Sequence, residues 1–129
     1  MYGVPADLDL RMFLGATLDQ LGIGSNEVQF NFGLVQRGEN GLPLPGQIMA
    51  SGDWELRGPD GAVVDRAVDI NSDRESYRLH LVLSQIVTGF KIDAPRSFTL
   101  QFDNAMSLTF LDDSEWYESI SILPCNIFI

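Results

Sequence analysis

The sequence has few of the residues that build covalent or metal-bound frameworks. Cys125 is its only cysteine and His80 its only histidine, which excludes an intrachain disulfide and a cysteine-rich zinc site. No apolar run approaches the roughly 18 residues that a membrane-spanning helix needs. The first residues also lack the basic and apolar regions of a secretory signal peptide, so the expected location is cytoplasmic.

Positive charge is scarce as well. The chain has 8 Lys and Arg residues against 18 Asp and Glu residues, which gives a net charge of −10 at pH 7. A negative field repels nucleic-acid phosphates and anionic lipid headgroups. We therefore expect neither nucleic-acid binding nor membrane binding, whereas a basic protein partner is compatible with this charge.

Motifs of known enzyme classes are missing too. The sequence contains no GxSxG elbow, no P-loop, no HExxH zinc motif and no GxGxxG turn that opens a helix. His80 lies inside a predicted helix, where a structural or solvent-exposed role is the ordinary one. We therefore predict no catalytic residue, no bound metal and no cofactor.

The chain does contain enough apolar residues for one core. Its 129 residues are 45% hydrophobic, which predicts a single domain over residues 1–129. Apolar residues alternate over 98–102 and 106–110, on either side of the pair Asp103-Asn104. This pattern is typical of a β-hairpin with one apolar face. Further strands are predicted at 16–23, 28–32, 47–56 with a bend at Gly52, 62–68, 86–92 and 118–123.

Two other segments have helical patterns. Pro5 lies just before Asp7, and apolar residues follow near helical spacing, which predicts a short helix over Asp7–Leu14. The cluster Asn71-Ser72-Asp73 is typical of a helix N-cap and predicts a second helix over about Asp73–Leu83. Residues 33–46 are rich in glycine and proline and are interpreted as a long hairpin connection at the surface.

The sequence also matches itself at an offset of 69 residues. Leu14, Leu18, Leu21 and Ile23 then face Leu83, Val87, Phe90 and Ile92, and with one insertion 28–32 faces 98–102. The pairs Trp54-Glu55 and Tyr117-Glu118 fall at comparable places downstream. The match indicates two pseudo-repeats, roughly residues 6–68 and 73–123, related by a pseudo-twofold axis, although alternating strands also produce such matches by chance.

These patterns together predict an α+β fold that is mostly antiparallel β. We expect about eight strands in a barrel-like or sandwich sheet, two short helices and one core that both pseudo-repeats share.

The last two-thirds of the chain contain three short motifs: a Ser-x-x-Trp-x-Leu strand, a Leu-x-Phe-Asp-Asn hairpin and a Tyr-Glu-Ser strand. The matching residues are Ser51, Trp54, Leu56, Leu83, Val87, Thr88, Phe98, Leu100, Phe102, Asp103, Asn104, Leu108, Tyr117, Glu118, Ser119 and Ile122. In this set the chain resembles a group of small bacterial proteins without an assigned activity. It departs from their pattern where Ala105 replaces a turn glycine and Ser84-Gln85 replaces Gly-Lys. The resemblance implies an immunity or accessory partner of a toxin.

The densest acidic cluster lies beside two aromatic residues. The candidate binding surface consists of Asp112, Asp113, Glu115, Trp116, Tyr117 and Glu118. Carboxylates beside exposed aromatic rings suit a basic protein surface, because the charges steer the encounter and the rings anchor it. The spacing of an EF-hand is absent. The ordinary alternative is a solvated turn, with Trp116 and Tyr117 packed in the core.

Three functions remain open at this point. The first is a non-enzymatic protein-binding module of immunity or accessory type. The second is a small-molecule-binding or enzymatic β-barrel, with a pocket between the halves lined by Trp54 and Tyr117. The third is a structural homo-oligomer, such as a homodimer, that is sealed through the apolar tail 127–129.

Overall fold

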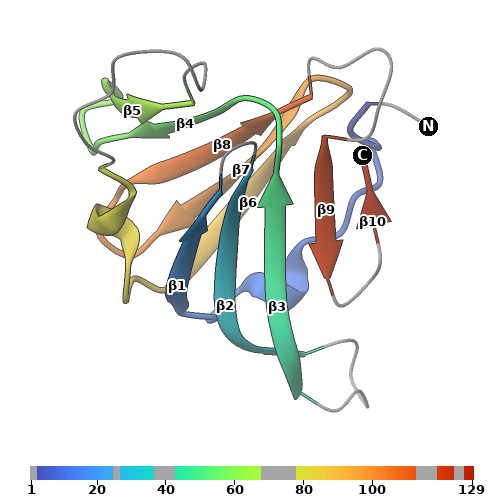
Figure 1. The fold of residues 1–129 in the computed structure, drawn as a ribbon, viewed down its shortest axis with the longest axis horizontal. Coiled ribbons are helices and arrows are strands. Elements are labelled where there is room, and N and C mark those ends of the chain that lie inside the picture. The colour runs from blue at the N-terminus through green and yellow to red at the C-terminus, as the bar shows by residue number, and fades with distance from the viewer. Residues whose placement is uncertain (1–2, 25–26, 37–42, 68–77, 113–118, 124–126) are drawn as a thin grey trace.

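The computed structural model describes residues 3–24, 27–36, 43–67, 78–112, 119–123 and 127–129. These residues form two five-stranded sheets that lie in two layers, and every strand pair is antiparallel (Figure 1). The first sheet has the order β1 (Leu18–Ile23), β2 (Val28–Gln36), β3 (Pro43–Ala50), β9 (Ile120–Leu123) and β10 (Ile127–Phe128). The second sheet has the order β5 (Val63–Arg66), β4 (Trp54–Arg57), β8 (Ser107–Leu111), β7 (Ser97–Phe102) and β6 (Val87–Asp93). The expectation of a mostly antiparallel β fold is confirmed.

Both sheets are open. Their outer strands are β1 and β10 in the first sheet and β5 and β6 in the second. Within the described ranges the two sheets are joined at one corner, where Thr17 and Ile86 form an isolated antiparallel bridge. A barrel would need outer strands that pair along their length, so the barrel expectation is wrong and the structure is a sandwich.

Single turns of 3-10 helix replace the expected α-helices. They are η1 (Arg11–Phe13) and η2 (Leu79–Val82), and the described part of the chain contains no α-helix. The expected helix over Asp7–Leu14 is therefore wrong, as is the described part of the one over Asp73–Leu83; residues 73–77 lie outside the described ranges. The fold that these residues form is all-β and not α+β. No described helix is long and apolar enough to span a membrane.

Packing explains why the turns are so short. Each turn buries one apolar pair three residues apart, Leu10 with Phe13 and Leu79 with Val82. Three residues per turn is the period of a 3-10 helix, which aligns such a pair on one side. The next residue is already extended, with ψ of 128° in the first case and 137° in the second. Leu14 and Leu83 thus end each turn after a single helical turn, and β1 and β6 begin four residues further on.

The glycine- and proline-rich segment is partly strand. β2 continues to Gln36 and β3 begins at Pro43, so the two arms of this hairpin are longer than the sequence predicts. Pro43 and Pro45 pair with β2, whereas β9 reaches β3 only from Gln47 onward. Proline has no backbone N–H to donate. It is tolerated at these positions because no described strand pairs with that edge of β3 there.

The predicted strand 47–56 is two strands in different sheets. β3 ends at Ala50, the chain bends at Ser51-Gly52, and β4 begins at Trp54 in the second sheet. The bend expected at Gly52 is therefore a crossover between layers. A second crossover leads from β8 in the second sheet to β9 in the first.

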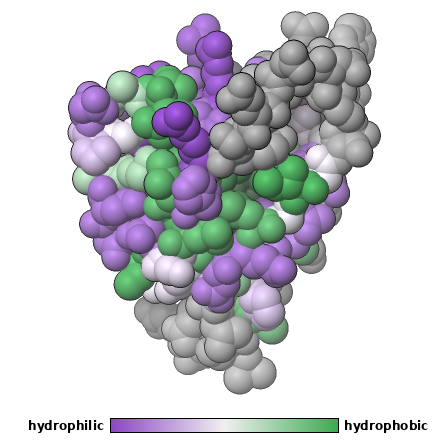
Figure 2. Space-filling model, turned by 60° about the vertical axis from the view of Figure 1, so that its left-hand side comes forward, coloured by the Kyte–Doolittle hydropathy of each residue, from purple (hydrophilic) through white to green (hydrophobic). Residues whose placement is uncertain are grey.

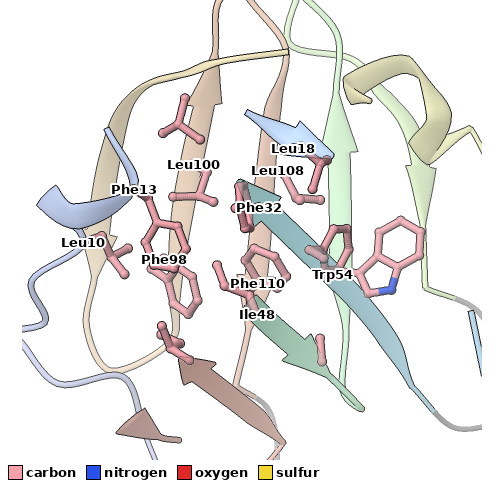
Figure 3. Close-up of a cluster of buried hydrophobic side chains, with 14 of the residues drawn as sticks. Leu10, Phe13, Leu18, Phe32, Ile48, Trp54, Phe98, Leu100, Leu108 and Phe110 are labelled. Atoms are coloured by element: carbon pink, nitrogen blue, oxygen red, sulfur yellow. The ribbon is translucent and has the colours of Figure 1, made fainter. Parts of the chain in front are cut away.

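Aromatic rings from both sheets fill the space between the layers. The ring of Phe110 stacks on Phe98, with 5.0 Å between ring centroids, and meets the ring of Phe30 edge-on at 5.1 Å. Phe13, from η1, packs edge-on against Phe32 at 5.0 Å. Figure 3 shows this cluster with its aliphatic neighbours. The alternation in the sequence predicts strands at Phe30, Phe32, Phe98 and Phe110, and the structure confirms these strands.

The β7–β8 hairpin contains a strained residue. Ala105 has a φ of +66°, which costs an L-residue about 1 kcal/mol or more because its Cβ crowds the backbone. Asn104 holds the turn, since its Oδ1 accepts the Met106 N–H at 3.2 Å. A glycine, which has no Cβ, fits this conformation without that cost.

We predict that Ala105→Gly raises the free energy of unfolding by about 0.5–1 kcal/mol, the relief of strain less the added freedom of the unfolded chain. Urea denaturation followed by circular dichroism measures the change. Ala62 is also exposed and has no positive φ, so Ala62→Gly is the control and lowers stability. Equal effects of the two substitutions would contradict the strain.

Candidate functional site

The candidate surface lies at the second crossover. Of its six residues the structure describes Asp112, which directly follows β8. The other five, Asp113, Glu115, Trp116, Tyr117 and Glu118, lie outside the described ranges.

Asp112 ties three segments of the chain together. Its carboxylate accepts hydrogen bonds from the backbone N–H of Gly3 and from the hydroxyl of Ser119, the latter at 3.3 Å. Its own backbone N–H donates to the carbonyl of Arg96 at 2.8 Å. The side chain is partly buried. Asp112 therefore anchors the start of the crossover, and the acidic run continues from a fixed point.

The first crossover runs beside the second. The backbone N–H of Ser51 donates to the carbonyl of Ser119 at 2.8 Å, and the N–H of Leu111 donates to the carbonyl of Asp53 at 2.9 Å. The Ser51 hydroxyl adds a bond to the same Ser119 carbonyl at 3.3 Å. These bonds place the backbone of Asp53, which is exposed, beside Leu111, the residue before Asp112. The end of the sandwich where both crossovers lie, named here the crossover end, thus carries carboxylates from two distant parts of the sequence.

Sequence reasoning missed Asp53. Its position between Gly52 and Trp54 marks a bend, which was the available signal, but the bend does not say which segment lies beside it. The neighbour is set by the strand order, in which β3 pairs with β9 and β4 pairs with β8.

Trp54, proposed for a pocket, is part of the hydrophobic core. It is 2% exposed, and its ring meets Phe30 edge-on with 6.5 Å between centroids. Figure 3 shows it at the side of the aromatic cluster. Its suggested companion Tyr117 lies outside the described ranges. Packing against the core accounts for the burial of Trp54.

The other polar groups that the structure describes form no second site. His80 lies on η2 and is exposed. Among the residues that the structure describes, no group of three or more His, Cys, Asp or Glu side chains is placed to hold a metal ion. Asp9 and Arg11 form an exposed ion pair at 2.7 Å. The hydrogen bonds from the side chain and the backbone of Arg11 lower the pKa of Asp9 to about 2, but a pair exposed in this way adds little to stability.

Some apolar side chains also reach the surface. Figure 2 shows hydrophobic residues along the middle of one face, bordered by hydrophilic ones. The large hydrophobic residues with an exposure of 40–50% are Leu14, Ile23, Leu44, Val63, Leu81 and Ile86. Leu14 directly follows η1, Leu81 lies in η2, and Ile86 lies in the bridge to Thr17. These three exposed side chains lie near the corner between the sheets, away from Asp53 and Asp112 of the crossover end.

Comparisons with protein-family models, with curated proteins and with solved structures found no match.

Proposed function

We propose that the chain is a non-enzymatic protein-binding module of immunity or accessory type, which binds a basic protein surface through the crossover end. The observation that carries this proposal is the pair of adjacent crossovers, because they bring Asp53 beside Leu111, one residue before the acidic and aromatic run begins at Asp112. Carboxylates gathered at one end of a chain with a net charge of −10 attract a basic partner and orient it as it approaches.

Aromatic anchors complete this binding mode. Trp116 and Tyr117 belong to the same run, and large aromatic residues contribute most of the binding energy in many protein interfaces. Charge then provides a fast and specific encounter, while the rings slow dissociation. Binding of this kind requires no catalytic group, and the sequence contains no motif for one.

The other two functions receive less support. Trp54 lies in the core, so the pocket alternative loses one of its two lining residues. Ile129 is 1% exposed and bonded to β9, so this residue of the tail is covered by the chain's own core, which weakens the seal proposed for a homo-oligomer.

The test uses two variants with the same change in charge. Wild-type chain, Asp53→Lys and Asp60→Lys serve as immobilised baits for native bacterial lysate, at low and at high salt. Asp60 is exposed in the β4–β5 turn, at the opposite end of β4. We expect Asp53→Lys to weaken capture of the specific partner tenfold or more, a loss of about 1.4 kcal/mol or greater. Asp60→Lys leaves capture nearly unchanged.

Salt and an aromatic variant separate the two contributions. Raising the ionic strength shortens the range of charge interactions, so partner capture falls at high salt, and Trp116→Ala weakens it further at both salt concentrations. Equal capture by the two lysine variants, or capture that salt leaves unchanged, contradicts the proposed surface. Circular dichroism of each bait verifies that it is folded.

A further inference from the structure

The two halves of the chain exchange strands. Each sheet takes three consecutive strands from one half, β1–β3 in the first sheet and β6–β8 in the second. The next two strands of each sheet come from the other half: β9 and β10 join the first sheet, and β4 and β5 join the second. In Figure 1, β9 (red) stands beside β3, and β4 (green) lies beside β8. Neither half therefore completes a sheet by itself.

Backbone hydrogen bonds at the corner between the sheets come in equivalent pairs. If 69 is added to the residue number in the first half and subtracted from the one in the second half, each bond of a pair becomes the other bond. The donor then lies in the other half. The first pair is Gly15 N–H to Val87 C=O and Ser84 N–H to Leu18 C=O, both 2.8 Å; the second is Leu18 N–H to Gln85 C=O and Val87 N–H to Ala16 C=O, 3.0 and 2.9 Å. Thr17 and Ile86, which bridge each other, are themselves 69 residues apart. A twofold relation between the halves accounts for all of these bonds.

The same relation holds at the crossover end and inside the hairpins. The bond from Ser51 to Ser119 corresponds to the bond from Leu111 to Asp53. The β1–β2 pair has a register shift after Leu18, and the β6–β7 pair has one after Val87. Asp53 is thus matched with Ser119. Trp54 corresponds to Ile120 and not to Tyr117, so the sequence-based pairing of Trp54-Glu55 with Tyr117-Glu118 was wrong.

We infer that each half of one chain also pairs with the opposite half of a second copy, so that two chains form a strand-exchanged dimer. An interface with twofold symmetry is the kind that identical partners share. The chain passes between the halves once, between Ala67 and Arg78. A first half paired with the second half of another copy therefore makes every bond described above. This inference is independent of the proposed function.

Two full-length variants with complementary defects provide the test. Phe30 and Leu108 are fully buried in the first and second halves, so Phe30→Asp and Leu108→Asp each place a carboxylate in the core and prevent folding of the single variant. When the two are co-expressed with different tags, the intact first half of one pairs with the intact second half of the other. We expect a soluble 1:1 complex with twice the 14.3 kDa mass of one chain and one folded core.

The control pair puts both defects in the same half. Ile48 is fully buried in β3, so Phe30→Asp with Ile48→Asp offers no intact first half and yields no soluble complex. If the complementary pair is no more soluble than this control, the inference is overturned.

A second measurement leaves the core unchanged. A protease recognition sequence is inserted between Ala67 and Arg78 of the wild-type chain, and the folded protein is cut there. Fragments that elute together and reassemble 1:1 after denaturation support the inference. Fragments that separate on gel filtration refute it, since halves that need a covalent link cannot recognise a second copy.

Discussion

Deleting Ile127 to Ile129 is expected to lower the free energy of unfolding by about 4 kcal/mol or more and to leave the oligomeric state of the folded protein unchanged. Ile129 is almost fully buried, and loss of a buried isoleucine costs about 2–5 kcal/mol. The deletion also removes three backbone hydrogen bonds of 2.7–3.1 Å between Ile129 and the residues Ser119 and Ile120, each worth about 1 kcal/mol. Such a loss is a large part of the 5–15 kcal/mol that stabilises most domains.

Ile129→Ala separates the two contributions, because it removes the side chain and keeps the backbone bonds. We expect it to cost about 3 kcal/mol, while Ile23→Ala, at a side chain that is half exposed, costs about 0.5 kcal/mol or less. Urea denaturation measures stability and light scattering measures mass. A shortened chain of unchanged stability but lower mass would instead assign the tail to an interface between subunits.

The strands and the core could be predicted from the sequence because alternation acts locally. In the hairpin of residues 98–110, every second side chain of the runs 98–102 and 106–110 is apolar, and β7 and β8 form the expected antiparallel pair. The turn spans three residues, 103–105, and not Asp103-Asn104 alone, because Phe102 bonds to Met106. Val28, Phe30 and Phe32 were placed on the buried face in the same way. One face of each strand is thereby assigned without knowledge of its neighbours.

The crossovers could not be predicted, because alternation does not say which sheet a strand joins. The stretch 47–56 has the pattern of one strand with a bend, yet β3 and β4 lie in different layers. The helix predictions were wrong for a related reason. A buried pair such as Leu10 and Phe13 fits three residues per turn as well as 3.6, and only packing against β2 determines which is formed.

The candidate site was predicted by composition and not by geometry. The run from Asp112 to Glu118 is visible as a cluster of charge and aromatic rings, so its location at the end of β8 could be found. That the Asp112 carboxylate would bind Gly3 and Ser119 could not be found, because both partners depend on the strand order. Asp53 was missed for the same reason.

Phe110→Ala is the core substitution for which we expect the largest effect, a loss of about 4 kcal/mol in the free energy of unfolding. Phe110 is fully buried on β8, and its ring contacts Phe98 in its own sheet and Phe30 in the other. Truncation opens a cavity between the layers and removes an aromatic contact that joins them. Phe90, on the outer strand β6, is only partly buried, so the same substitution there should cost about 1–2 kcal/mol.

A double-mutant cycle shows whether Phe110 joins the two layers or merely fills space. If the edge-on contact with Phe30 contributes by itself, Phe30→Ala and Phe110→Ala together cost less than the sum of the single losses, with a coupling of about 1 kcal/mol. The cycle of Phe110 with Phe90 should give a coupling near zero. Additive losses in both cycles would mean that the sheets adhere through buried area alone. A coupling found with Phe30 and not with Phe90 would show that the Phe30–Phe110 contact specifically joins the two halves of the chain.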